Sequence, residues 1–123
     1  MDELNKGLEI AWQGPDAAAA LARCRAQLAA WEITPPAVEP LVLDFGLGRF
    51  AETGLIEFWL ANEATAGYCG KYLFVFDGQS CPRHRHRTKH ETFHLLKGRA
   101  RLDIEGRELI LEPGDTAPVA PGQ

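Results

Sequence analysis

The sequence lacks the features that mark secreted, disulfide-rich proteins and membrane-spanning proteins. Its three cysteines, Cys24, Cys69 and Cys81, are an odd number at unrelated spacings, so we expect no disulfide framework. No apolar run approaches the roughly 18 residues that a membrane span needs. The start at Met1-Asp2-Glu3 is acidic and no apolar segment follows it. We therefore expect no signal peptide and a cytoplasmic protein.

An excess of positive charge is also missing. The 123 residues include 13 basic and 17 acidic side chains, which gives a net charge of -4. This balance argues against a nucleic-acid or anionic-membrane partner. With 46% hydrophobic and 24% charged residues, the chain has the composition of one ordinary globular domain with a single core.

Histidine is scarce, and all four histidines lie in residues 78–98, GQSCPRHRHRTKHETFHLLKG. Extended backbone points alternate side chains to the same face, so a strand through His84 and His86 would present two imidazoles side by side. If the chain reverses over residues 87–90, a second strand from Glu91 returns a carboxylate to the two rings. Two imidazoles and one carboxylate suit Fe(II), Mn(II) or Zn(II) and leave positions for a substrate. The alternative is an ordinary hairpin with these residues on its surface.

Helical signals are confined to residues 1–34. Pro15 and Asp16 suit the first turn of a helix, and an alanine-rich run follows them. Spacings of three and four residues give this helix one narrow apolar stripe, made of Leu21, Cys24, Leu28 and Trp31. We expect the stripe to pack against the outside of a barrel or against a partner subunit. A shorter helix is predicted over Leu4 to Trp12, and Pro35-Pro36 ends the helical region.

The rest of the chain has the pattern of strands and turns. Short apolar or alternating segments predict strands over residues 41–43, 55–60, 71–76, 100–104, 108–112 and 116–120. Residues 71–76 are apolar on both faces, so we expect that strand to be covered on both sides. Glu105-Gly106 predicts a tight turn. Strands at this even spacing indicate an antiparallel sandwich or barrel, and hence a mostly β protein.

The spacing within the histidine stretch resembles the first conserved motif of the cupin superfamily. It reads Gly78, five residues, His84, one residue, His86, four residues, Glu91, six residues, Gly98. The resemblance implies a cupin-type double-stranded β-helix, the jelly-roll barrel, and it implies a bound metal.

This resemblance also implies a division of the chain. Residues 37–123 would form the cupin barrel domain, and residues 1–36 would form an N-terminal helical segment that packs on it. Gly114-Asp115 and Pro121-Gly122 resemble the beginning of a second cupin motif, whose histidine is a fourth metal ligand. We therefore expect the chain to be a piece of a longer protein. The alternatives for the fourth ligand are water, His94 and another subunit.

Within the cupins, the block from Asp44 to Glu91 resembles the D-lyxose ketol-isomerase family. The residues that carry the likeness are residues 44–50, Gly54-Leu55, Phe58, Asn62, Lys71-Tyr72, Gln79, Pro82, His84, His86, Lys89 and Glu91. The likeness implies a metal-dependent aldose-ketose isomerase that acts on a small free sugar such as D-lyxose or D-mannose.

The same resemblance implies roles for four residues. His84, His86 and Glu91 would bind a divalent metal, with Mn first and Zn or Fe as alternatives. Such a metal binds the adjacent sugar oxygens while a hydrogen moves between C1 and C2. Lys89 would act as a proton donor or an electrostatic stabiliser, and the alternative for Lys89 is a solvated lysine in a turn.

The neighbours of these residues are expected to be structural. Cys81 is predicted to be a small buried hydrophobe, His90 an exposed turn residue and His94 a packed strand histidine. Three arginines alternate with the histidine pair and are predicted to face solvent or a partner subunit: Arg83, Arg85 and Arg87.

Two further functions remain open on the same barrel. One is a non-catalytic sugar-binding or regulatory cupin, and the other is a different metalloenzyme such as a dioxygenase or an epimerase. The partners we expect are a small-molecule sugar and a second copy of the chain in a homodimer, with no nucleic acid and no membrane.

Overall fold

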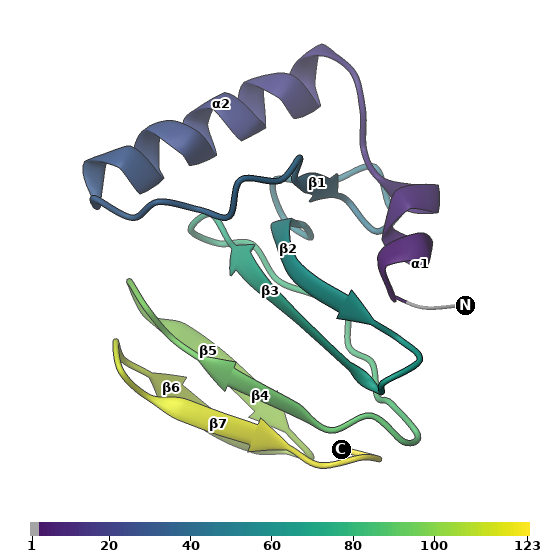
Figure 1. Cartoon of the computed structure of the whole chain (residues 1–123). Coiled ribbons are helices and arrows are strands. Elements are labelled where there is room, and N and C mark those ends of the chain that lie inside the picture. Colours follow the sequence, from purple (N-terminus) through teal and green to yellow (C-terminus); the bar gives the residue numbers. More distant parts are fainter. Residues whose placement is uncertain (1–2) are drawn as a thin grey trace. The chain divides into compact units, whose positions relative to one another are not determined.

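The computed structural model describes residues 3–123, which form two compact units divided between Pro82 and Arg83. Within the described residues, two helices precede seven strands, so the chain is mostly β with its helices at the N-terminal side (Figure 1). The predicted fold class of a mostly β chain with an N-terminal helical segment is therefore confirmed in its secondary structure.

Both predicted helices are present, α1 (Glu3–Ile10) and α2 (Pro15–Ala30). Pro15 occupies the first turn of α2, where its missing N–H is not needed, and Asp16 places negative charge at the positive end of the helix. The helix stops before Pro35-Pro36, because Glu32 adopts a left-handed φ of 58° and the Ile33 N–H donates to the Leu28 carbonyl at 2.9 Å. No helix in residues 3–123 is long and apolar enough to span a membrane.

The first unit contains an antiparallel sheet of β1 (Leu41–Leu43), β2 (Leu55–Glu63) and β3 (Tyr68–Phe74), in that order (Figure 1). A register shift between Trp59 and Ala61 interrupts the pairing of β2 with β3. Such a bulge bends the strand and increases its local twist.

Helix α2 packs on one face of this sheet and forms the core of the first unit. The buried residues of this core are Ala17, Ala20, Cys24, Leu28, Val42, Phe50, Ile56, Phe58 and Phe74. Leu21 and Trp31 pack against it while partly exposed, so all four residues of the predicted apolar stripe face the core. Burial of this stripe stabilises α2 beyond what its helix-favouring residues provide.

The second unit consists of two antiparallel strand pairs. Strand β4 (Glu91–His94) pairs with β7 (Thr116–Val119), and β5 (Ala100–Ile104) pairs with β6 (Arg107–Leu111). Glu105-Gly106 joins β5 to β6 with φ values of 49° and 78°, which confirms the predicted tight turn.

Three local predictions are wrong. Residues 81–86 form no strand, because the chain leaves the sheet after Ser80, which makes an isolated bridge to Thr53. Cys81 is exposed for the same reason. Strand β3 is not covered on both sides, since Tyr72 and Leu73 each keep 38% of their surface exposed.

Candidate metal centre

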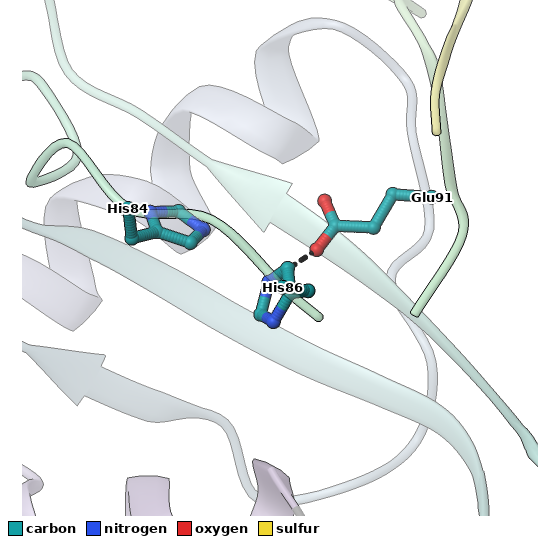
Figure 2. Close-up of side chains that lie close together, drawn as sticks. All are labelled: His84, His86 and Glu91. Carbon is teal, nitrogen blue, oxygen red and sulfur yellow. Dashed lines mark ion pairs between the residues drawn. The ribbon is translucent and has the colours of Figure 1, made fainter. Parts of the chain in front are cut away.

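Three of the predicted site residues lie together in the second unit. The possible metal-binding atoms of His84, His86 and Glu91 all lie within 4.8 Å of one another. Figure 2 shows the Glu91 carboxylate turned toward the His86 ring, and the His86 Nε2 and Glu91 Oε1 atoms are 2.7 Å apart. The His84 and His86 rings have centroids 5.0 Å apart and are nearly perpendicular, at 78°.

Backbone hydrogen bonds hold the two chain segments that carry this cluster. Glu91 is the first residue of β4 and lies opposite Val119 of β7. Just beyond β7, the Gly122 N–H donates to the His86 carbonyl at 2.7 Å. A turn fixes Gly122, because the Ala120 N–H donates to Gln123 Oε1 at 2.9 Å. Strand β7 and its turn therefore contact both the Glu91 and the His86 segments.

The geometry of the cluster fits a divalent ion. Neighbouring ligands bound at about 2.1 Å to one ion lie about 3 Å apart, close to the observed separation of His86 and Glu91. The remaining separations reach no more than 4.8 Å, a gap that small side-chain rotations close. The site is also only partly shielded, with the His86 side chain 32% and the Glu91 side chain 18% exposed, so a substrate can approach it. Two imidazoles and one carboxylate are compatible with a divalent metal.

Lys89 contacts the same carboxylate. Its Nζ lies 3.1 Å from Glu91 Oε1, and its side chain is 30% exposed. It is therefore not a fully solvated turn lysine, since it forms an ion pair inside the cluster. The ammonium group brings a proton donor and a positive charge to the edge of the candidate metal centre.

The other two histidines and the three arginines of this stretch are exposed. His94 is exposed on the face of β4 opposite to Glu91, and its Nδ1 lies 2.8 Å from Thr116 Oγ1 on β7. This position argues against His94 as a fourth ligand and shows that it is not packed in a core. His90 is exposed as predicted, and so are Arg83, Arg85 and Arg87.

Nothing in the sequence indicated two features of the structure. The contact of Gly122 with His86 joins residues far apart in the chain, although the Pro121-Gly122 pair did indicate a turn. The second feature is the burial of Glu57, which is 6% exposed and forms an ion pair with Lys71.

Comparison with known proteins finds a family match for the second part of the chain. Residues 73–123 match the cupin domain family. No solved structure gives a significant match. The domain match includes the entire His84, His86 and Glu91 cluster.

Three relatives of the chain are named as D-lyxose isomerases. The chain is 42% identical to the D-lyxose/D-mannose isomerase of Thermosediminibacter oceani, over 62% of this chain and 45% of the relative. It is 32% identical to the D-lyxose ketol-isomerase of Cohnella laeviribosi, over 73% of this chain and 64% of the relative. The D-lyxose ketol-isomerase of a Thermofilum species is also 32% identical, over 65% of this chain and 58% of the relative. The chain thus spans less than two thirds of each of these relatives.

Residues 73–123 are therefore similar to the cupin domain family, and the chain is similar to D-lyxose ketol-isomerases. The predicted resemblance and the predicted cupin fold class are confirmed. The division of the chain at residues 36 and 37 stays a prediction.

Proposed function

We propose that this chain carries the metal-binding part of an aldose-ketose isomerase that acts on a small free sugar such as D-lyxose or D-mannose. The observation that carries this proposal is the placement of His84, His86 and Glu91 within 4.8 Å of one another. Relatives named D-lyxose isomerases support the choice of substrate class.

His84, His86 and Glu91 are the residues that would hold a divalent ion, and Mn(II) is the ion we propose, with Zn(II) and Fe(II) as alternatives. When bound, such an ion would act as a Lewis acid and make the C2 proton of the sugar easier to remove. The pairing of β4 with β7 fixes the Glu91 backbone, and the Gly122 hydrogen bond fixes the His86 backbone. These contacts keep the three side chains close together before a substrate arrives.

Lys89 is the residue we propose to handle charge at the sugar oxygens. During isomerisation the C2 proton leaves, a proton arrives at C1, and the hydroxyl proton at O2 is lost as O1 gains one. The Lys89 ammonium lies 3.1 Å from Glu91 Oε1, so it can donate a hydrogen bond to a neighbouring sugar oxygen as negative charge develops there.

An isomerisation assay tests this function. Full-length protein loaded with Mn(II) is expected to convert D-lyxose into D-xylulose, or D-mannose into D-fructose. Lys89→Met should lower kcat about 100-fold, the range typical for a lost general acid. Lys97→Met is the matched control, because Lys97 is an exposed lysine beyond β4 and should leave kcat unchanged.

The isomerase proposal would be refuted if the full-length protein with bound metal turned over none of the aldoses tested. Oxygen consumption by the Fe(II)-loaded protein would point to a dioxygenase instead. Stabilisation by a sugar without turnover would point to a binding or regulatory cupin.

The proposal also covers the oligomeric state of the protein, its location in the cell and the arrangement of its two segments. We propose a homodimer in the cytoplasm, with residues 1–36 packed on a barrel built from residues 37–123. Light scattering should then give about twice the chain mass of 13.6 kDa.

A further inference from the structure

One oxygen of the Glu91 carboxylate is contacted by two neighbouring side chains. Glu91 Oε1 lies 2.7 Å from His86 Nε2 and 3.1 Å from Lys89 Nζ. Figure 2 shows this carboxylate turned toward the His86 ring, beside His84, the third candidate ligand. The Lys89 ammonium therefore already pairs with a carboxylate that the candidate metal centre uses as a ligand.

Partial burial strengthens the ion pair of Lys89 with Glu91. The Lys89 side chain is 30% exposed and the Glu91 side chain is 18% exposed. Salt screens partly buried charges much less than exposed ones. Arg99 also forms an ion pair in the second unit, at 3.0 Å, but its partner Glu112 is 55% exposed and is not a candidate ligand. The pair at Lys89, in contrast, bears directly on metal binding.

Lys89 and a bound metal ion would compete for the negative charge of Glu91. An ion binds a carboxylate oxygen at about 2.1 Å, so an ammonium that stays 3.1 Å from Oε1 would lie within about 5 Å of an ion on that oxygen. Two positive charges at this distance repel each other, and more strongly near a protein than in bulk water. Binding of an ion therefore costs free energy unless the ammonium turns away.

The side chain of Lys89 is able to turn in this way. Its four-carbon stem is flexible, and the ammonium donates hydrogen bonds without a fixed orientation. The Lys89 backbone belongs to no helix or strand and lies between His86 and Glu91 in the chain. The ammonium can thus leave the carboxylate and still remain next to the site.

We propose that Lys89 is the internal counter-ion of Glu91 in the metal-free chain and that its displacement sets the affinity of this centre for a divalent ion. In the metal-free chain the ammonium balances the charge of the carboxylate. When an ion takes over this charge, the ammonium turns toward solvent or toward a sugar oxygen. The inference rests on the metal centre of the proposed function, but on no reaction.

The sign of one change in affinity distinguishes this role from a structural one. Lys89→Met keeps the length of the side chain and removes its charge, so it should bind Mn(II) about ten-fold more tightly than the wild type, by titration calorimetry at one pH and low salt. If Lys89 only held Glu91 in position, the same variant would bind Mn(II) equally well or more weakly. Either of these two results would overturn the proposal.

Three further variants show whether the charge is the cause. Lys89→Gln also lacks the charge and should bind more tightly, so the result does not depend on the folding of one variant. Lys89→Arg keeps the charge and should bind no more tightly than the wild type. Lys97→Met removes the charge of an exposed lysine beyond β4 and should leave the affinity unchanged. Tighter binding by Lys89→Arg or by Lys97→Met would contradict the role of the Lys89 charge.

The outcomes separate this inference from the proposed activity. Turnover of an aldose together with equal Mn(II) affinities of the wild type and Lys89→Met would refute the counter-ion and keep the isomerase. Tighter Mn(II) binding by Lys89→Met without turnover of any aldose by the full-length protein would keep the counter-ion and refute the isomerase. Absence of Mn(II) binding in both proteins would refute the counter-ion together with the metal centre.

Discussion

Gly54 shows at the scale of single residues how closely the first unit is packed. A Cβ at this position would lie 2.5 Å from Phe50 Cδ2 and 2.8 Å from the Leu43 carbonyl oxygen. Gly54→Ala should therefore lower the free energy of unfolding by about 1–3 kcal/mol, measured in urea. Gly70→Ala is the matched control in the same sheet, because its Cβ would meet only Leu60 at 3.9 Å. Equal stability of the two variants would contradict this packing.

Cys24 gives a pH dependence that can be measured. Burial raises the pKa of its thiol from the ordinary 9.0 to about 11, with Arg25 opposing the shift. Below pH 9 the thiol is protonated in both the folded and unfolded chains, so its contribution to stability is constant. As pH rises from 9 to 11, only the unfolded chain loses the proton, so the free energy of unfolding falls by about 2–3 kcal/mol.

The measurement compares urea unfolding of the wild type and of Cys24→Ala between pH 8 and 11. The difference between them should shrink with rising pH, because the variant has no thiol to ionise. A constant difference across this range would show that the thiol is not protected by the core.

At the scale of elements, the C-terminus of α2 carries local strain. Glu32 adopts φ 58°, a left-handed conformation in which a side chain is disfavoured, and the residue is exposed. Glu32→Gly should raise the free energy of unfolding by about 0.5–1 kcal/mol, measured by thermal or urea unfolding. Gln27→Gly, in the interior of the same helix, should lower it by a similar amount. If both substitutions lowered the free energy of unfolding, Glu32 would not be strained at this helix end.

Strand β7 and its following turn are predicted to position the candidate metal ligands. Gly122 has φ 88° and donates its N–H to the His86 carbonyl, so Gly122→Ala should strain this contact. We expect about a ten-fold loss of Mn(II) affinity by titration calorimetry, the size typical of residues that support metal ligands. Gly98→Ala has similar strain, with φ 80°, at a turn outside this contact, and should keep the affinity. Equal Mn(II) affinities of the two variants would show that β7 and its turn do not position the metal ligands.

The elements that could be predicted from the sequence are those set by local signals. Pro15, the alanine run and the apolar spacing define α2, and Glu105-Gly106 defines the turn between β5 and β6. The pairing of β4 with β7 joins distant segments, and no local pattern specifies it. The alternating residues around His84 favour extended backbone, but a strand also needs a regular ladder of hydrogen bonds with a neighbouring strand, and residues 81–86 belong to no strand of the described structure.

At the scale of the whole molecule, the sequence indicated the candidate metal centre better than the ion pair of Glu57 with Lys71. The ligand-type residues are close in the chain and their spacing is characteristic, so His84, His86 and Glu91 could be found without a structure. The Glu57–Lys71 ion pair depends on the register of β2 with β3 and on burial, neither of which the sequence displays.

Metal content after dialysis tests the central claim most directly. Wild-type protein dialysed against Mn(II) and then against buffer should retain about one ion per chain by inductively coupled plasma mass spectrometry, and His94→Ala should retain the same. His86→Ala and Glu91→Ala should each retain less than about a tenth of an ion per chain, because each removes one of three ligands. Equal metal content in all four proteins would contradict the assignment of His84, His86 and Glu91 as the metal-binding residues.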